Sequence, residues 1–169
     1  GNVFVATNEY GPYPSISGRV FKITAGGAIT TILDVTGDGV GNELDTASGL
    51  DVDAAGVVHV LGSRSCNGFK IPPTGVITKF IDFGGTVVGS YLQKPADVAA
   101  DGAGNSFVVG RGSDNAFKIT PGGMITQIID ATGDGAGHGL SRPEGVAVDG
   151  LGNIYVSGRD SENVFKITP

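Results

Sequence analysis

The sequence predicts an all-β fold made of small repeated sheets, and three observations support this. The tripeptide Phe-Lys-Ile recurs every 48 residues, at Phe21, Phe69, Phe117 and Phe165. Within each repeat, apolar residues alternate with polar ones or form short blocks, as they do in strands. Thirty of the 169 residues are glycine, which suits many tight turns and excludes a coiled coil or helical bundle. Four antiparallel strands in about 48 residues make one blade of a β-propeller.

The strands are clearest in the third repeat, where short apolar blocks alternate with clusters of Gly, Asp and Ser. We name the strands of a blade A to D from the propeller axis outward, so a D strand is followed by the A strand of the next blade. Residues that favour tight turns separate these strands. The expected strands are Met124–Ile129 (D), Val146–Val148 (A), Asn153–Val156 (B) and Val164–Ile167 (C).

The two ends of the chain belong to incomplete blades. The chain begins with a B strand at Gly1–Ala6 and ends with a C strand at Val164–Thr168, so the expected order is B-C-D, two complete blades, and A-B-C. This corresponds to a single propeller segment of about three and a half blades. Its divisions are a partial blade at 1–46, blades at 47–94 and 95–142, and a partial blade at 143–169.

Such an order leaves apolar blade faces and open sheet edges at both ends, which invite pairing. Two interpretations remain open: the chain is part of a longer propeller, or several copies form a homo-oligomer that closes the ring. A compact four-bladed ring made by one chain is a third alternative.

Three spaced motifs of the last repeat resemble a known family. The segments Pro143–Asp149, Gly152–Val156 and Asn163–Ile167 together look like the NHL repeat of β-propellers. The resemblance covers essentially the whole chain and implies the propeller fold. It does not select an activity, because NHL-type propellers include lyases, relatives of lactonases, and platforms that bind proteins or RNA.

Charge and composition exclude some partners. The net charge is −6, and the eleven Lys and Arg residues are scattered, so nucleic acid is not expected as a partner. No apolar run is long enough to span a membrane. The single cysteine, Cys66, makes no disulfide within the chain and has no nearby histidine in sequence that would activate it as a nucleophile. The low Lys content and the many Gly, Ser, Thr and Asp residues suit an extracellular or periplasmic protein.

Strand direction places the B-to-C and D-to-A connections on one side of the blades, which we call the loop-rich face; the short A-to-B and C-to-D turns lie on the opposite side, the short-turn face. Serine and asparagine recur in register in the B-to-C loops at Ser65, Ser113 and Ser161 and at Asn67, Asn115 and Asn163. They are expected to stabilise turns or to form a polar array. The candidate binding residues on this face are Arg64, Arg111, Asp114, Arg159 and Asp160.

An insertion of seven residues separates the first B and C strands, within Asn8–Ser15. It holds Tyr10 and Tyr13 in a chain that is otherwise poor in aromatic residues. We expect a loop that is either a tolerated surface insertion or a contact loop for a ligand or partner.

The first D-to-A loop resembles a calcium-binding loop, with side-chain oxygens at alternate positions followed by glycine. The candidate ligands are Asp34, Thr36, Asp38, Asn42 and Asp45. Thr36 replaces the usual acid, and Asp45 replaces a longer glutamate. The alternative is a glycine-rich turn capped by aspartate side chains. We therefore expect no cofactor, with calcium bound in this loop as the alternative.

One set of residues could carry catalysis on the loop-rich face: His138, with Arg142 and Glu144. A neutral histidine serves as a base or metal ligand, and arginine holds a carboxylate. The other histidine, His59, lies inside a predicted B strand and is expected to pack in the sheet. We therefore expect a non-catalytic module that binds protein or carbohydrate. The alternative is a metal-assisted lyase or lactonase-like enzyme with His138 at the propeller axis.

Overall fold

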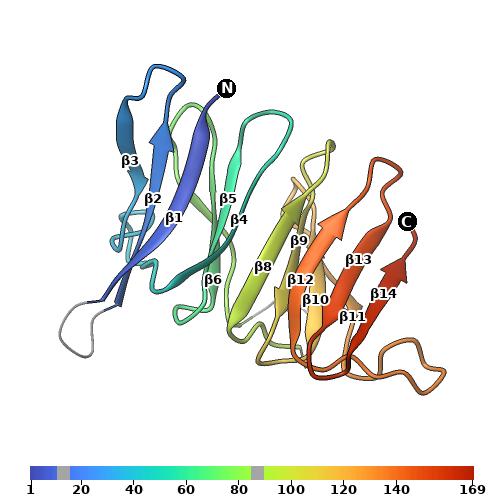
Figure 1. Cartoon of the computed structure of the whole chain (residues 1–169). Coiled ribbons are helices and arrows are strands. Elements are labelled where there is room, and N and C mark those ends of the chain that lie inside the picture. The colour runs from blue at the N-terminus through green and yellow to red at the C-terminus, as the bar shows by residue number, and fades with distance from the viewer. Residues whose placement is uncertain (11–15, 85–89) are drawn as a thin grey trace.

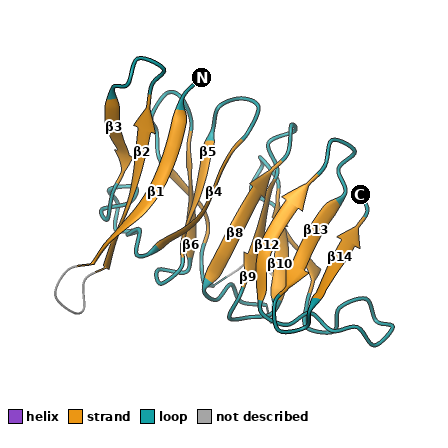
Figure 2. Ribbon diagram, viewed as in Figure 1, coloured by secondary structure: helices purple, strands orange, loops and turns teal. Residues whose placement is uncertain are grey.

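The computed structural model describes residues 1–10, 16–84 and 90–169, and all regular structure in these ranges is β-strand. Fourteen strands form four antiparallel sheets of three, four, four and three strands (Figures 1 and 2). The expected all-β propeller-type fold is confirmed. Across the described ranges, no helix is long and apolar enough to cross a membrane.

In every sheet, strands that follow one another in sequence are hydrogen-bonded neighbours. The first sheet contains β1 (Val3–Tyr10), β2 (Ile16–Ile23) and β3 (Ile29–Leu33), and the second contains β4 (Ala47–Val52), β5 (Val58–Gly62), β6 (Asn67–Ile71) and β7 (Thr78–Ile81). The third contains β8 (Pro95–Ala100), β9 (Ser106–Gly110), β10 (Asn115–Ile119) and β11 (Ile125–Ile129), and the fourth contains β12 (Pro143–Val148), β13 (Ile154–Gly158) and β14 (Asn163–Ile167).

The sheets follow one another in a row, with the first and fourth sheets at opposite ends (Figure 1). The innermost strands β4, β8 and β12 are neighbours, and β1 contacts β4. The row is open in this chain, so the chain alone does not form the compact four-bladed ring that the sequence left as an alternative.

The core consists of apolar layers between consecutive sheets. Val20, Val58 and Phe69 belong to the layer between the first and second sheets, and Leu61 and Phe117 to the layer between the second and third. Phe69 and Phe117 of the Phe-Lys-Ile repeats are fully buried, as expected for core residues. Each buried phenylalanine alternates along its strand with a lysine on the opposite side.

The first hairpin differs from the sequence-based expectation. We expected β1 to end at Ala6 and a loop to begin at Asn8, but β1 continues to Tyr10 and pairs with β2 over its whole length, from Val3↔Ile23 to Tyr10↔Ile16. The physical reason is that the inserted residues extend a regular antiparallel ladder instead of leaving it. Tyr13, the other candidate contact residue, lies outside the described residues.

The outer faces of the first and fourth sheets carry exposed apolar side chains. Val3 is 57% exposed on the first sheet, and Val164 is 66% exposed on the fourth. At the position that matches Val164 in the third sheet, Ala116 is fully buried because the fourth sheet covers it. The outer faces of the first and fourth sheets, which we call the end faces, thus match sheet faces that a neighbouring sheet covers elsewhere in the chain.

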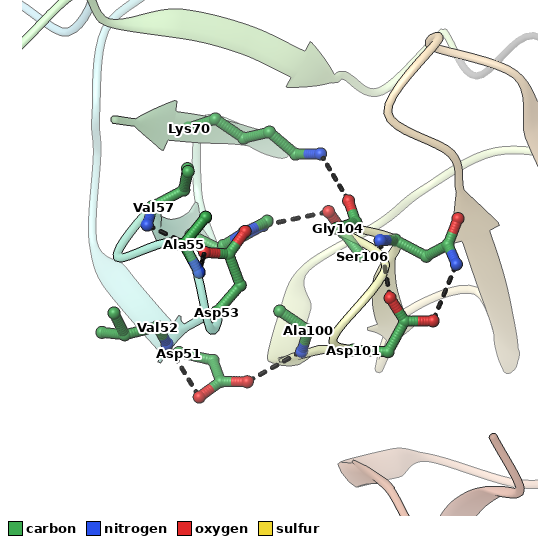
Figure 3. A network of polar contacts seen from close by, with 12 residues as sticks. Asp51, Val52, Asp53, Ala55, Val57, Lys70, Ala100, Asp101, Gly104 and Ser106 are labelled. Atoms are coloured by element: carbon green, nitrogen blue, oxygen red, sulfur yellow. Dashed lines mark hydrogen bonds and ion pairs between the residues drawn. The ribbon is translucent and has the colours of Figure 1, made fainter. Parts of the chain in front are cut away.

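Polar side chains also join consecutive sheets (Figure 3). Asp51 Oδ2 accepts a hydrogen bond from the backbone N–H of Ala100 at 2.7 Å, which joins β4 to β8. Asp97 Oδ2 accepts one from the N–H of Val146 at 3.1 Å, which joins β8 to β12. Burial raises the pKa of Asp97 above its ordinary value. Each carboxylate thus contacts the inner strand of the next sheet.

Candidate functional site

Repeated polar contacts fix the loops of the loop-rich face. In the third sheet, Ser113 donates to Asn115 Oδ1 at 2.7 Å and accepts the backbone N–H of Gln93 at 3.1 Å. Asn115 Nδ2 donates to the carbonyl oxygen of Tyr91 at 3.0 Å. This B-to-C loop is thereby tied to the D-to-A loop that precedes its sheet. The same contacts recur at Ser65 and Asn67 and at Ser161 and Asn163.

These contacts explain why serine and asparagine recur in register. They tie loops together, so their polar atoms already have partners within the chain. They also require glycine at the end of the B strand in the second, third and fourth sheets. A Cβ atom at Gly62, Gly110 or Gly158 would overlap the serine and asparagine side chains.

The loop-rich face also contains left-handed backbone at residues other than glycine, which is uncommon and marks sites where surrounding contacts hold a particular conformation. Arg142 has φ 50° and lies just before β12. Its N–H donates to Asp114 Oδ1 at 2.6 Å, and its carbonyl accepts the N–H of Arg159 at 3.0 Å. Among the described residues, the non-glycine positions with positive φ are Thr46, Lys94 and Arg142 in the D-to-A loops, and Cys66, Asp114 and Glu162 in the B-to-C loops.

Three arginines from three loops gather around one carboxylate. Glu144 Oε1 lies 3.3 Å from Arg142 Nε, 3.5 Å from Arg159 Nη1 and 3.7 Å from Arg111 Nη1. Arg142 Nη1 also lies 3.9 Å from Asp160 Oδ2. We call Arg111, Arg142, Arg159 and Glu144 the arginine cluster. It brings together Arg142 and Glu144, which we expected to act together, with two of the candidate binding arginines.

Glu144 reaches this position through a bulge in β12. Pro143 pairs with Gly158 and Gly145 pairs with Ser157, so Glu144 is the extra residue between the two pairs. A bulge re-aims a side chain and increases the local twist. The Glu144 side chain is 36% exposed, as is suitable for a group at the edge of a surface site.

The remaining candidate binding residues are distributed along the same face. Arg64 Nε lies 3.5 Å from Asp45 Oδ2, in the second sheet's loops and apart from the arginine cluster. Asp114 acts mainly on the backbone, because its carboxylate accepts the Arg142 N–H. Tyr10 ends β1 in the first hairpin.

The loop that resembles a calcium-binding loop contains aspartate side chains that cap its turns. Asp34 Oδ1 accepts the Thr36 hydroxyl at 2.6 Å and its N–H at 2.9 Å, and this hydrogen bonding holds the pKa of Asp34 below its usual value. Asp38 Oδ2 accepts Asn42 Nδ2 at 2.6 Å. Asp45 instead pairs with Arg64. In the described ranges, no group of three or more His, Cys, Asp or Glu residues is placed to hold a metal ion.

His138 belongs to the equivalent loop of the third repeat and does not contact the arginine cluster. Its Nδ1 lies 2.7 Å from Asp134 Oδ2, and its side chain is 71% exposed. Asp134 corresponds to Asp38, and His138 takes the place of Asn42. The structure thus gives His138 the loop-bridging contact that asparagine makes in the first repeat.

A shallow depression of about 670 Å³ lies beside the arginine cluster. Ser141, which precedes Arg142, lines it, as does Asp114, which binds the Arg142 N–H. His138 and Glu162 line it as well. The depression therefore adjoins the loops that carry the arginine cluster, although Arg111, Arg142, Glu144 and Arg159 do not line it themselves.

A second group of residues has the types found in a hydrolytic triad, but it is buried and a substrate cannot reach it. His59 Nδ1 lies 3.0 Å from the Ser106 hydroxyl, and His59 Nε2 lies 3.3 Å from Asp53 Oδ2. His59 and Ser106 are fully buried between the second and third sheets. Burial lowers the pKa of His59 below its usual value. The expectation that His59 packs within the sheet agrees with this position, but its link to Ser106 was not foreseen.

Sequence reasoning also missed Asp51 and Asp97, which join inner strands. The sequence signal for them was that each aspartate lies between apolar residues within a strand segment. Their partners come from the next sheet, which the repeat alone does not reveal.

The fold and the loop-rich face define an all-β protein of the propeller type. No family model and no curated protein matches the sequence. Among solved structures, the chain is similar to a streptogramin B lyase, with TM-score 0.67 and 13% identity over 95% of this chain and 50% of that one. It is also similar to the gluconolactonase XC5397 from Xanthomonas campestris, with TM-score 0.62 and 16% identity over 90% of this chain and 54% of that one.

A third similar structure is virginiamycin B lyase from Staphylococcus aureus, with TM-score 0.59 and 14% identity over 90% of this chain and 51% of that one. The chain thus spans about half the length of these structures. Such low identities establish the shared fold only.

Proposed function

We propose that the chain is a non-catalytic β-propeller module of the NHL type that binds a protein or carbohydrate ligand through its loop-rich face. The observation that carries the proposal is the gathering of Arg111, Arg142 and Arg159 around Glu144. Guanidinium groups form directional, charge-assisted hydrogen bonds with ligands. Loops held by repeated internal contacts present these groups with little loss of conformational freedom on binding.

The placement of the histidines supports binding over catalysis. His138 bonds to Asp134 within its own loop, and His59 is buried together with Ser106. A catalytic base needs to reach a substrate proton. Among the described residues, neither histidine contacts Glu144 or the three arginines around it.

The proposal is tested by screening the wild-type chain against immobilised glycans and proteins and repeating each positive with two variants. Arg142→Ala changes the loop-rich face, and Pro73→Ala changes the short-turn face as a control. We expect Arg142→Ala to weaken binding and Pro73→Ala to leave it unchanged. Loss of binding in Pro73→Ala alone would contradict the proposal.

A second candidate function is a metal-assisted lyase or lactonase-like enzyme that uses His138 with Arg142 and Glu144. The observation that favours it is the fold similarity to a streptogramin B lyase and a gluconolactonase. Turnover of virginiamycin B and gluconolactone, measured with and without divalent metal ions, tests it. Activity that disappears in both His138→Ala and His138→Asn would support the enzyme and contradict the binding module.

We also propose that, for the 169-residue chain on its own, a second copy covers the end faces. Each internal interface joins one face of a sheet to the opposite face of the next sheet, and the outer faces of the first and fourth sheets are repeat equivalents of these two surfaces. The chain spans about half the length of the similar structures, so two copies together match that length. Light scattering should give at least a dimer, and Val164→Asp should lower the mass. A monomer at all concentrations would contradict this assembly.

A further inference from the structure

We propose that the arginine cluster binds the carboxylate of an acidic carbohydrate, one that contains uronic acid units. This inference rests on the proposed function and narrows its ligand class. The three guanidinium groups are concentrated at one place in a chain whose net charge is −6. The carboxylates of Glu144 and Asp160 balance part of this positive charge, and guanidinium groups that converge on one place can bind a further carboxylate through directional, charge-assisted hydrogen bonds.

The arginines retain hydrogen-bonding capacity for a ligand. All three approach the same atom, Glu144 Oε1, and their distances of 3.3, 3.5 and 3.7 Å exceed the 2.7–2.9 Å of a tight charge-assisted bond. Each guanidinium carries about five N–H donors. The shared Glu144 oxygen and the 3.9 Å contact of Arg142 with Asp160 therefore leave most of these donors available at a partly exposed surface.

The backbone holds two of these arginines in place. The Asp114 carboxylate and the left-handed conformation of Arg142 fix the start of β12, and the Arg142 carbonyl accepts the Arg159 N–H. Asp114 is thus a positioning residue, which acts through Arg142. Such fixed geometry is what bidentate recognition of a planar carboxylate requires.

The adjoining depression favours a carbohydrate over a protein. Its volume of about 670 Å³ suits a small ligand. Its lining combines the polar residues Ser141, His138, Asp114 and Glu162 with Leu140 and Ala131, and contains no Tyr, Trp or Phe. Protein interfaces instead use aromatic anchors in an apolar centre. A uronate bound with its carboxylate on the arginines would place its ring hydroxyls beside these polar side chains.

Glu144 occupies the position that the ligand carboxylate would take. Both are carboxylates, and both would be held by the same guanidinium groups. Glu144 therefore competes with the ligand from within the chain. Replacement of Glu144 by glutamine, which has nearly the same shape but no charge, should strengthen ligand binding.

The test is isothermal titration calorimetry with trigalacturonate, a matched neutral trisaccharide (xylotriose) and a triglutamate peptide. We expect trigalacturonate to bind more tightly than either of the others. Arg142→Ala and Arg159→Ala should each weaken it by about tenfold or more, and Glu144→Gln should strengthen it. Arg19→Ala is the matched control, because Arg19 pairs with Glu9 on the first sheet, and it should bind as the wild type does.

Unchanged binding in Arg142→Ala and Arg159→Ala, both folded by circular dichroism, would overturn the inference, as would tighter binding of triglutamate. If trigalacturonate fails to bind but another ligand still requires the loop-rich face, the inference fails and the proposed function stands. If ligands bind only at the short-turn face, both fail.

Discussion

The imidazole Nδ1 of His59 lies 3.0 Å from the hydroxyl oxygen of Ser106, which belongs to the next sheet. The other ring nitrogen lies 3.3 Å from Asp53 Oδ2. In the fourth sheet, Tyr155 takes the position of His59 and donates to Asp149 Oδ2 at 3.1 Å, at the position that matches Asp53. The contact to the turn aspartate thus recurs in the repeat, and the link to Ser106 of the next sheet is added by the Nδ1 nitrogen of His59.

The His59 link predicts a loss of stability in mild acid. Burial lowers the pKa of His59 in the folded chain below the ordinary value of 6.5, while the unfolded chain keeps that value. Below 6.5 the unfolded chain binds a proton that the folded chain does not, so the free energy of unfolding falls as the pH drops. The charged groups that act on His59 are Asp53, Lys70 and Asp51. Urea unfolding at about pH 8 and about pH 5 measures the fall.

The matched variant is His59→Phe, since Phe107 occupies the equivalent position in the third sheet. It should cost about 1–3 kcal/mol at neutral pH, because Asp53 and Ser106 lose their partner. It should also reduce the fall between the two pH values. An equally large fall in this variant would show that other groups cause the acid sensitivity.

Gly110→Ala should destabilise the chain by about 1–3 kcal/mol, because the added Cβ would overlap the Ser113 and Asn115 side chains. Gly102→Ala is the control, since nothing lies within 4 Å of its added Cβ. Its effect should stay within about 0.5 kcal/mol. Thermal unfolding of both variants measures the difference, and equal effects would contradict the proposed steric reason.

Asn115→Ala should cost about 1–3 kcal/mol, because it removes the bond to the Tyr91 carbonyl and leaves buried polar groups without partners. Asn163→Ala removes the same contact in the fourth sheet, where the site is more exposed. Water can replace the lost bond there, so the cost should be smaller. Urea unfolding compares the two, and a larger effect at Asn163 would contradict this reasoning.

Calcium should leave the melting temperature unchanged. The Asp34 and Asp38 carboxylates already accept hydrogen bonds from Thr36 and Asn42, and Asp45 pairs with Arg64. Differential scanning calorimetry in millimolar CaCl2 and in EDTA measures the effect. A clear rise with CaCl2 that Asp34→Asn abolishes would establish a calcium site in this loop.

The sequence predicted most of the fold because its 48-residue period aligns equivalent strands and loops. Ser113 and Asn115 could be assigned to a turn because they recur in register, and Arg142 and Glu144 could be assigned to one face from strand direction. The first hairpin was predicted incorrectly. An insertion can lengthen a ladder or form a loop, and both have similar local sequences.

The contacts between sheets could not be predicted. The Asp97 bond to Val146 depends on how far one inner strand is shifted against the next, which the period does not specify. The convergence of Arg111 on Glu144 likewise requires the angle between the third and fourth sheets. We grouped His138 with Arg142 because they are close in sequence. In the structure, the His138 side chain instead forms a hydrogen bond with Asp134 of the same loop.

Backbone NMR of the isotope-labelled chain, titrated with trigalacturonate and with neutral oligosaccharides, locates the ligand-binding face. We expect the shifted amides to cluster at Arg111, Arg142 and Arg159 and in the loops around them. Shifts confined to the short-turn face, for example around Gly56 and Gly75, would contradict the assignment of ligand binding to the loop-rich face.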